Sequence, residues 1–424
     1  MSRKTLLIII VLFFCIGVGF LGYYFLKPAS VIEAPLDNSG VQNPFGNFFP
    51  SENVPTTPNV TMPEKETSTI QYSEPIRNLR KISDVPIAGG VVFDKTATST
   101  AGTISNTIFR YVERATGHIY ETTATSTASL RISNTTIPKI YEAFFLEDKN
   151  QVAFRYLGND EKIETYVATI RATTTDEGVK TNLEGIFMQK DISDFSTSPN
   201  GRNIFVLSPN ANSASAAQLL GQSALASNPN KQSTLFNSPI PVWSAEWFGG
   251  EQIAITSKPS YNAQGVLYFI NSRTGFQEKI LGPIPGLVTK PSPDGKKVLY
   301  SKNDGSGIAT NFLTVSTNII KSLPVGTIAE KCVWSRNNKD IFCAVPNSSL
   351  TGQYPDAWYM GVVSFNDSLI KIDTEQETIR TIMSIGAETT EPLDMINLQL
   401  SPKEDYLVFT NKRDLSFWSL DIKE

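Results

Sequence analysis

Histidine and cysteine are scarce in this sequence. Its 424 residues include one histidine, His118, and three cysteines. A site with two or three histidine ligands is therefore excluded, and so is a four-cysteine zinc site. With 37 Lys and Arg against 41 Asp and Glu, the formal net charge of −4 makes the chain a poor electrostatic partner for nucleic acid. We predict no metal, no cofactor and no nucleic-acid partner.

Catalytic sequence motifs are also missing. Residues 221–225 read GQSAL, which lacks the last glycine of a Gly-x-Ser-x-Gly nucleophile elbow. His118 follows RATG, a context that favours a surface turn residue over an acid or base. No catalytic residue is predicted. Paired carboxylates for glycan cleavage stay open as an alternative, because their spacing is three-dimensional.

An uncharged apolar run occupies residues 5–26, directly after Arg3 and Lys4. A helix of 22 residues at about 1.5 Å per residue spans the roughly 30 Å hydrocarbon core of a bilayer. The two basic residues predict a cytoplasmic N-terminus and an extracytoplasmic remainder. We predict that residues 1–27 are a cytoplasmic stub and a transmembrane signal-anchor helix of a single-pass cell-membrane protein. A cleaved signal peptide is the alternative.

The composition changes after the apolar run. Eight prolines recur between residues 28 and 75 among Asn, Ser, Thr and Glu. Such a segment buries too little apolar surface to offset its ordering entropy. Residues 28–78 are therefore predicted to be a Pro-rich disordered linker that separates the membrane from the next domain.

A turn-and-strand pattern repeats through the rest of the chain. Residues 292–301 read SPDGKKVLYS, and residues 198–207 and 401–410 match this template. With looser copies at 146, 247 and 335, the intervals between successive copies are 52, 49, 45, 43 and 66 residues. A period in the forties is the length of a four-stranded propeller blade. The apolar second strand of each copy indicates burial on both faces, as when blades stack.

These units predict an all-β, seven-bladed β-propeller over residues 79–424. Six or eight blades are alternatives, because residues 211–230 in the third unit predict a loop or short helix. The last unit lacks an outer strand, which residues 79–83 can supply, so that the N- and C-terminal strands close the ring and remove an exposed edge. The Thr- and Ser-rich runs at 96–103 and 122–129 predict polar loops.

The repeats resemble the PD40 family of WD40-like β-propeller repeats, the TolB-like repeats. The resemblance covers roughly residues 80–424, and SPDGKKVLYS is its strongest match. It implies a propeller fold and a role in the cell envelope. The chain shows no separate α/β domain like that of TolB, so partnership with the TolB transport system is not implied. Propellers host many functions, so the resemblance does not name an activity.

Two cysteines flank a predicted hairpin in the sixth unit. Pairing Trp334 with Ile341 places Cys332 opposite Cys343, close enough for a disulfide bond. An oxidising extracytoplasmic compartment permits that bond. Two buried free thiols are the alternative.

The 66-residue interval marks an insertion at residues 350–368. Its candidate binding residues are Tyr354, Asp356, Trp358 and Tyr359, since aromatic rings beside an acidic group suit peptide or carbohydrate contact. For the segment as a whole, we favour the interpretation that it packs back over the propeller and plugs it. Its deletion is expected to weaken partner capture without unfolding the ring.

We predict a non-enzymatic binding or scaffolding module in the cell envelope, with a protein or glycan partner. The alternatives are an envelope glycan hydrolase or lyase with carboxylates in the propeller channel, and a structural subunit of an envelope complex. A cluster of acidic residues at one channel mouth would favour the enzyme. An apolar or aromatic rim would favour binding.

Overall fold

The computed structural model describes residues 78–99, 102–175, 178–210, 218–348 and 350–423. The predicted anchor and all but the last residue of the predicted linker lie outside these residues. Within the described part of the chain, no helix has the length and apolar character needed to cross a bilayer.

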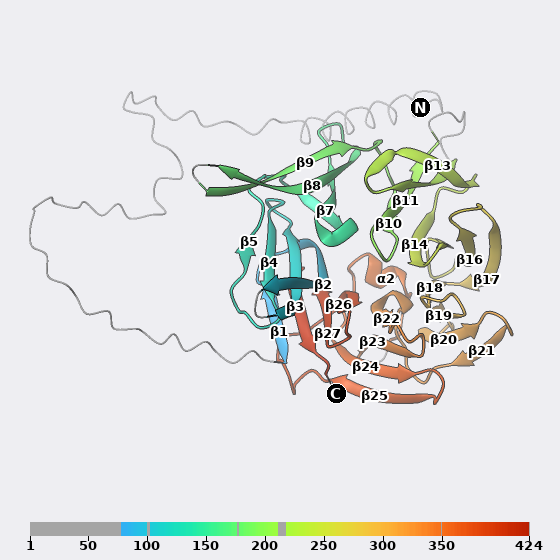
Figure 1. Ribbon diagram of the computed structural model, residues 1–424. Helices are drawn as coiled ribbons and strands as arrows, with labels where there is room; N and C mark the ends of the chain where they lie inside the picture. The colour runs from blue at the N-terminus through green and yellow to red at the C-terminus, as the bar shows by residue number, and fades with distance from the viewer. Residues whose placement is uncertain (1–77, 100–101, 176–177, 211–217, 349, 424) are drawn as a thin grey trace, which may run out of the picture. The chain divides into compact units, whose positions relative to one another are not determined.

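Seven antiparallel sheets of four strands each make up the ring (Figure 1). The fold is thus an all-β, seven-bladed β-propeller, as the repeat predicts. Blade 1 contains β2 (Ile87–Ser99), β3 (Gly102–Glu113), β4 (Ile119–Thr123) and β5 (Leu130–Arg131). Blade 2 contains β6 (Ile140–Phe145), β7 (Gln151–Leu157), β8 (Ile163–Thr175) and β9 (Gly178–Phe187). Blade 3 contains β10 (Asp194–Thr197), β11 (Asn203–Pro209), β12 (Leu219–Leu225) and β13 (Asn228–Ser238).

The remaining blades follow the same order. Blade 4 contains β14 (Trp243–Gly249), β15 (Gln252–Ser257), β16 (Gln264–Asn271) and β17 (Gln277–Pro285). Blade 5 contains β18 (Val288–Pro291), β19 (Lys297–Asn303), β20 (Ile308–Thr314) and β21 (Ile319–Ser322). Blade 6 contains β22 (Cys332–Trp334), β23 (Asp340–Pro346), β24 (Asp367–Asp373) and β25 (Thr378–Met383). Short helical elements are η1 (Glu147–Lys149), η2 (Ala329–Lys331) and α2 (Asp356–Tyr359).

Blade 7 joins the two ends of the described chain. It contains β26 (Met395–Leu400), β27 (Tyr406–Asn411) and β28 (Phe417–Asp421), with β1 (Leu79–Ser83) as its outer strand. Leu79 pairs with Leu420 and Lys81 with Trp418. The predicted closure is therefore confirmed, and β28 is not left as an open sheet edge.

The second strands form the apolar layer between blades, as their sequences predict. In β7, Val152, Ala153 and Phe154 are fully buried, although successive side chains point to opposite faces of the sheet. Burial on both faces follows because each blade is covered by a neighbour on either side. The turn before β19 is held by Ser292, whose hydroxyl donates to Asp294 at 2.8 Å, while Gly295 has φ of 71°. Asp294 thus has the turn role expected from sequence.

Two sequence expectations are wrong. The Thr-rich run at 96–103 is mostly strand rather than loop, because β2 extends to Ser99 and β3 begins at Gly102, with Thr96 opposite Ser105, while residues 100–101 lie outside the described part. Threonine is β-branched and favours strands even where little is buried. The range 211–230, predicted to be a loop or short helix, contains β12, its turn and the start of β13, with residues 211–217 outside the described part. Of these strands only β13 is the outer strand of its blade, and its exposed positions need few apolar residues.

Candidate functional site

The insertion lies on one face of the ring, which we call the insertion face. Blades are antiparallel, so the connections from second to third strands leave on the same face as those between blades. The insertion connects β23 to β24, the second and third strands of blade 6. Its helix α2 lies toward the centre of the ring (Figure 1).

Polar contacts hold the insertion across the ring. The Asp356 carboxylate accepts hydrogen bonds from the Ser260 hydroxyl (2.9 Å) and the Tyr261 backbone N–H (3.1 Å), both in the β15–β16 connection of blade 4. On the other side, Lys412 in the β27–β28 connection of blade 7 donates to the Trp358 carbonyl oxygen at 2.7 Å. The insertion therefore covers part of the insertion face, anchored on both sides.

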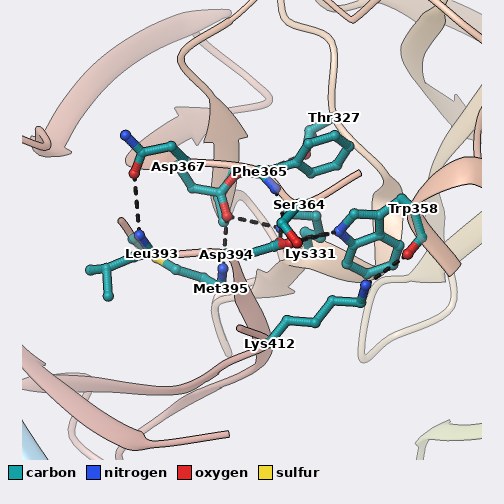
Figure 2. Close-up of polar contacts among 12 residues, drawn as sticks. Thr327, Lys331, Trp358, Ser364, Phe365, Asp367, Leu393, Asp394, Met395 and Lys412 are labelled. Carbon is teal, nitrogen blue, oxygen red and sulfur yellow. Dashed lines mark hydrogen bonds and ion pairs between the residues drawn. The ribbon is translucent and has the colours of Figure 1, made fainter. Parts of the chain in front are cut away.

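A buried charge cluster lies beneath the insertion (Figure 2). Lys331 is fully buried, and its ammonium contacts the carboxylates of Asp367 (Oδ2 at 2.8 Å) and Asp394, which are also fully buried. Trp358 donates its indole N–H to Asp394 at 3.0 Å, and the Phe365 N–H donates to the same carboxylate at 3.0 Å. This cluster joins η2, the insertion and the start of blade 7.

One carboxylate oxygen of the cluster lacks a hydrogen-bond partner among the described residues. Asp367 Oδ2 also accepts the Met395 N–H at 2.7 Å, but Oδ1 has no hydrogen-bond partner among the described residues. Burial raises the pKa of Asp367 to about 6, although Lys331 offsets part of that effect. Sequence reasoning missed this cluster, because its members are far apart along the chain and no motif links them.

A cavity of about 880 Å³ runs along the first strands of blades 2 to 5 to the insertion face. The β26 residue Asn397 and two residues of blade 6, Glu330 and Tyr359, complete its wall. Its charged lining residues are Glu142, Asp194, Glu246, Lys258, Lys290 and Glu330. Its aromatic lining residues are Phe144, Phe195, Trp247 and Tyr359. Carboxylates and aromatic rings together make this cavity the candidate functional site.

Each cavity carboxylate has a protein partner. Glu142 pairs with the buried Arg155, and Asp194 accepts the backbone N–H groups of Ala245 (2.7 Å) and Phe195 (2.9 Å). The other two are Glu246, which contacts Lys290 at 2.6 Å, and Glu330, which accepts the Tyr359 hydroxyl at 2.7 Å. The positions of the acidic groups are thus fixed by the ring before any ligand binds.

Burial shifts the titration of these groups. It raises the pKa of Glu142 and of Asp194, and nearby positive charges, those of Arg155 and Lys258, offset only part of the effect. Glu330 and Tyr359 are exposed residues of the cavity wall, and the protein atoms packed near their carboxylate and hydroxyl groups partly desolvate them. That desolvation raises the pKa of Glu330, and together with the Glu330 charge it raises the pKa of Tyr359 well above 10. Such shifts are typical of functional sites.

The four insertion residues predicted to bind a ligand have different environments. Tyr354 and Trp358 are buried within the insertion, so they support it from inside. Asp356 is half-buried and is bound to Ser260 and Tyr261. Tyr359 alone among the four is both exposed, at 39%, and part of the cavity wall. Their binding role remains a prediction, which the structure narrows to Tyr359.

Sequence reasoning missed the acidic and basic residues of the cavity. A signal was present: charged side chains interrupt the first strands, as Glu142 does in IYEAFF and Glu246 in WSAEWFG. A charge in a strand that is otherwise apolar indicates a wet or functional face. These charged residues could be recognised as part of a site only once the strands were known to border a channel.

The remaining sequence candidates lie away from the cavity. Trp334 pairs with Ile341 and Cys332 with Cys343, the register predicted from sequence. The cysteine sulfur atoms lie 2.12 Å apart, as a disulfide. His118 lies beside the turn after β3, where its Nε2 contacts the Thr136 hydroxyl at 3.0 Å. In the described ranges, no three His, Cys, Asp or Glu side chains are grouped to hold a metal ion.

Comparison with known proteins adds little to this description. No protein-family model and no curated protein matches the sequence. Among solved structures, an oligogalacturonate lyase in complex with manganese aligns with a TM-score of 0.48 and 8% identity over 80% of this chain and 99% of its own. The β-propeller domain of the Trilobed protease from Pyrococcus furiosus aligns with a TM-score of 0.47 and 10% identity over 78% and 98%. TolB from Acinetobacter baumannii aligns with a TM-score of 0.40 and 12% identity over 70% and 80%.

Proposed function

We propose that this chain is a non-enzymatic binding module of the cell envelope, which captures a protein or glycan at the insertion-face cavity. The observation that carries the proposal is the cavity itself. Five blades and an insertion contribute to a concave site of about 880 Å³, with aromatic rings and a few fixed polar groups. Concave sites of this size and lining are characteristic of ligand recognition.

The location in the envelope is part of the same proposal. Residues 5–26 are long and apolar enough to anchor the chain, and Arg3 and Lys4 favour a cytoplasmic N-terminus. The linker at residues 28–78 then holds the ring away from the membrane. A ring carried in this way presents its binding face to partners in the extracytoplasmic space.

Tyr359 provides the sharpest test, because it lines the cavity and is not part of the buried core. Crosslinking on intact cells, followed by pull-down of the full-length chain, is expected to capture a ligand with the wild type and to lose it with Tyr359→Ala. Phe276→Ala is the matched control, since Phe276 is an exposed aromatic in the turn between β16 and β17 on the opposite face. Equal capture by the wild type and Tyr359→Ala would refute the proposal.

Deletion of residues 350–368 is a poorer test than the sequence indicates. That deletion removes Trp358 and Asp367 together with the insertion, and it leaves Lys331 and Asp394 without two of their buried partners. Loss of capture by the deletion variant would then reflect damage to the ring rather than the loss of a binding contact. The point substitution avoids this problem.

A second candidate function is an envelope glycan hydrolase or lyase. Four carboxylates in one cavity are the observation that favours it, since glycan cleavage uses paired acidic groups. We favour binding because every one of the four is already engaged by a protein group. Incubating the full-length chain with envelope oligosaccharides and measuring new reducing ends or unsaturated sugar products tests the enzyme. A product lost in Glu142→Gln would establish it.

A further inference from the structure

We propose that the side chains of Lys331 and Asp367 react with each other to form an intramolecular amide bond, with loss of one water, and that Asp394 carries the proton between them. An amine and two carboxyl groups meet there in a part of the fold that is closed to solvent (Figure 2). The bond lies in blade 6, and its formation does not depend on the cavity or on any ligand.

The reacting groups are held within reach of each other. The Lys331 ammonium lies 2.8 Å from Asp367 Oδ2, and both side chains are fully buried. Lys331 ends η2, directly before β22, and Asp367 is the first residue of β24, opposite Pro346 of β23. Amide formation needs the nitrogen within about 3–3.5 Å of the carboxyl carbon, a separation that a hydrogen bond to one of its oxygens allows. Fixed positions of this kind lower the barrier without a separate catalyst.

Aromatic rings enclose the amine. The Lys331 Nζ lies 5.0 Å from the ring centre of Trp358 and 5.0 Å from that of Phe365. Both rings belong to the insertion and are buried. An apolar enclosure disfavours the charged forms of an amine and a carboxyl group, so that a proton passes more easily from one to the other. The same enclosure keeps out the water that would reverse the reaction by hydrolysis.

The two oxygens of Asp367 have different surroundings. Oδ2 accepts the Met395 backbone N–H at 2.7 Å, whereas Oδ1 has no hydrogen-bond partner among the described residues. A backbone N–H on the oxygen that stays bound to carbon stabilises the negative charge that develops there during the reaction. Oδ1 is therefore the oxygen that leaves. Its departure removes an unsatisfied buried acceptor, a group that otherwise lowers stability.

Asp394 is placed to carry the proton. Its carboxylate contacts the Lys331 ammonium and accepts the N–H groups of Trp358 and Phe365, each at 3.0 Å. These two neutral donors hold the carboxylate in place after Lys331 has lost its charge. Trp358 reaches both oxygens of Asp394, so neither oxygen lacks a protein donor. For this reason we assign Asp367, and not Asp394, as the carboxyl group that reacts.

The step balances in atoms and charge. The Lys331 ammonium and the Asp367 carboxylate together hold three protons. One proton passes through Asp394 to Asp367 Oδ1, and the amine then attacks the carboxyl carbon. The N–C bond forms, the C–Oδ1 bond breaks, and a second proton follows the first, so that Oδ1 leaves as water and the amide nitrogen keeps the third. Burial raises the pKa of Asp367 to about 6, so the protonated carboxyl group is well populated near that pH.

The bond fixes the end of the insertion to the ring. It joins the start of β22 to the start of β24 across β23, beside the disulfide between Cys332 and Cys343. A covalent link of this kind survives heat and denaturant, which separate an ion pair. The ion pair between Lys331 and Asp367 is the state before the bond forms, so the titration of Asp367 is a property of the unlinked chain.

Tryptic mapping of the full-length chain tests the bond. The chain is purified in detergent, incubated for several days at about pH 6, then denatured, reduced and alkylated before digestion. Reduction is required because the disulfide joins the same two tryptic peptides. Peptide 322–336 is expected to be joined to peptide 340–371, lighter than the two together by one water and uncut after Lys331. Fragmentation of the joined peptide is expected to place the link between Lys331 and Asp367.

One control lies within the same chain. Lys339 and Glu375 form an exposed ion pair at 2.7 Å, and their tryptic peptides are expected to stay separate because water surrounds the pair. Lys331→Arg keeps the positive charge but has no nucleophilic amine, and is expected to abolish the link. Asp394→Asn is expected to slow its formation by about a hundredfold or more, the contribution of a positioned proton carrier. Tryptophan fluorescence shows whether each variant is folded.

Three results would overturn the inference. The first is a wild-type map with only separate peptides and cleavage after Lys331, which does not depend on the folding of any variant. The second is a link from peptide 322–336 to peptide 381–403, which would show that Asp394 reacts in place of Asp367. The third is a link that forms equally fast in Asp394→Asn, or that also joins Lys339 to Glu375. The proposed function is tested separately, by ligand capture with Tyr359→Ala.

Discussion

At the scale of single residues, the buried Lys331 links the segments that lie beneath the insertion. Its ammonium lies between Asp367 and Asp394, and all three side chains are inaccessible to water. Charges without water are stabilised only by their partners, so removing one partner leaves an uncompensated charge. Because Asp394 also accepts the Trp358 indole N–H, the cluster determines where the insertion lies and therefore where Tyr359 meets the cavity.

Lys331→Met is expected to lower the free energy of unfolding by about 3–5 kcal/mol, because two buried carboxylates lose their cation. Urea unfolding followed by tryptophan fluorescence measures the change. Lys339→Met is the matched control, since Lys339 forms an exposed pair with Glu375, and we expect no measurable effect from it. Equal stability of the wild type and Lys331→Met would contradict the account of the cluster.

The raised pKa of Asp367 makes the free energy of unfolding depend on pH, and the direction of the shift fixes the sign of that dependence. Its pKa is raised from 3.8 to about 6 in the folded chain, so the folded state takes up a proton more readily than the unfolded state. The stability that this proton contributes is present below about pH 4 and is lost as the pH rises through 6. A shift of this size corresponds to roughly 3 kcal/mol.

The comparison with Asp367→Asn isolates this contribution. Between about pH 7 and about pH 4, the wild type is expected to gain stability relative to the variant, whose side chain does not titrate. Urea unfolding at both pH values gives the difference between the two proteins, so the other titrating groups cancel. Parallel pH profiles for the two proteins would show that Asp367 is not the group responsible.

At the scale of structural elements, the β22–β23 hairpin connects the fold to the redox state of its compartment. Cys332 and Cys343 are buried opposite one another at the base of that hairpin, in the same blade as the insertion. A disulfide there closes a short loop and restricts the unfolded chain, which stabilises the folded state by roughly 2–3 kcal/mol in the chain-entropy description.

The number of reactive thiols tests the bond. Titration of the full-length chain under denaturing, non-reducing conditions is expected to find one thiol, that of Cys15. After reduction the same titration is expected to find all three cysteines. Three reactive thiols before reduction would exclude the bond between Cys332 and Cys343.

Closure of the ring depends on β1. Leu79 is buried in the core of blade 7 near Trp418 and Leu420, and the Arg80 guanidinium also contacts Thr122 of blade 1 at 3.1 Å. Without β1, the outer face of β28 becomes an unpaired sheet edge, a template for pairing with other chains.

A ring that starts at residue 84 is therefore expected to self-associate or aggregate, because β28 is left open. Size-exclusion chromatography with light scattering measures this. A ring that starts at Gln71 keeps β1 and is the matched control, which we expect to be monomeric. A monomeric, equally stable protein without β1 would show that the closure contributes little.

At the scale of the whole molecule, the ring brings distant residues into one cavity. Glu142 and Glu330 are separated by most of the propeller sequence, yet they line the same site, because the first strands of the blades converge on the central axis. A shape of this kind presents a large rigid face at small entropic cost on binding. That property is the physical basis of the binding function proposed here.

The anchor is a prediction for the full chain. Carbonate washing of membranes is expected to leave the full-length chain in the membrane fraction, because residues 5–26 span the bilayer. A chain that lacks residues 1–27 is expected in the soluble fraction. Release of the full-length chain by carbonate would argue against a transmembrane anchor.

Local patterns were sufficient to predict the architecture. The SPDG-type turn and the apolar strand after it recur in six of the seven blades for the same physical reason, so they predicted the blade length, the order of strands and the missing outer strand, while six or eight blades stayed open as alternatives. Patterns failed at β12 and β13, because the small and polar residues of these third and outer strands resemble a loop. The Trp334–Ile341 register was predictable, since hairpin geometry fixes it locally.

The sequence alone determined the all-β repeat, its closure by residues 79–83 and the presence of an insertion in blade 6. Only the tertiary structure decided which residues meet: Tyr359 with Glu330, Lys331 with Asp367 and Asp394, and four carboxylates around one cavity. The reason is physical. Backbone periodicity and turn chemistry act between near neighbours in the chain, whereas a site depends on contacts between blades, and these exist only once the ring has closed.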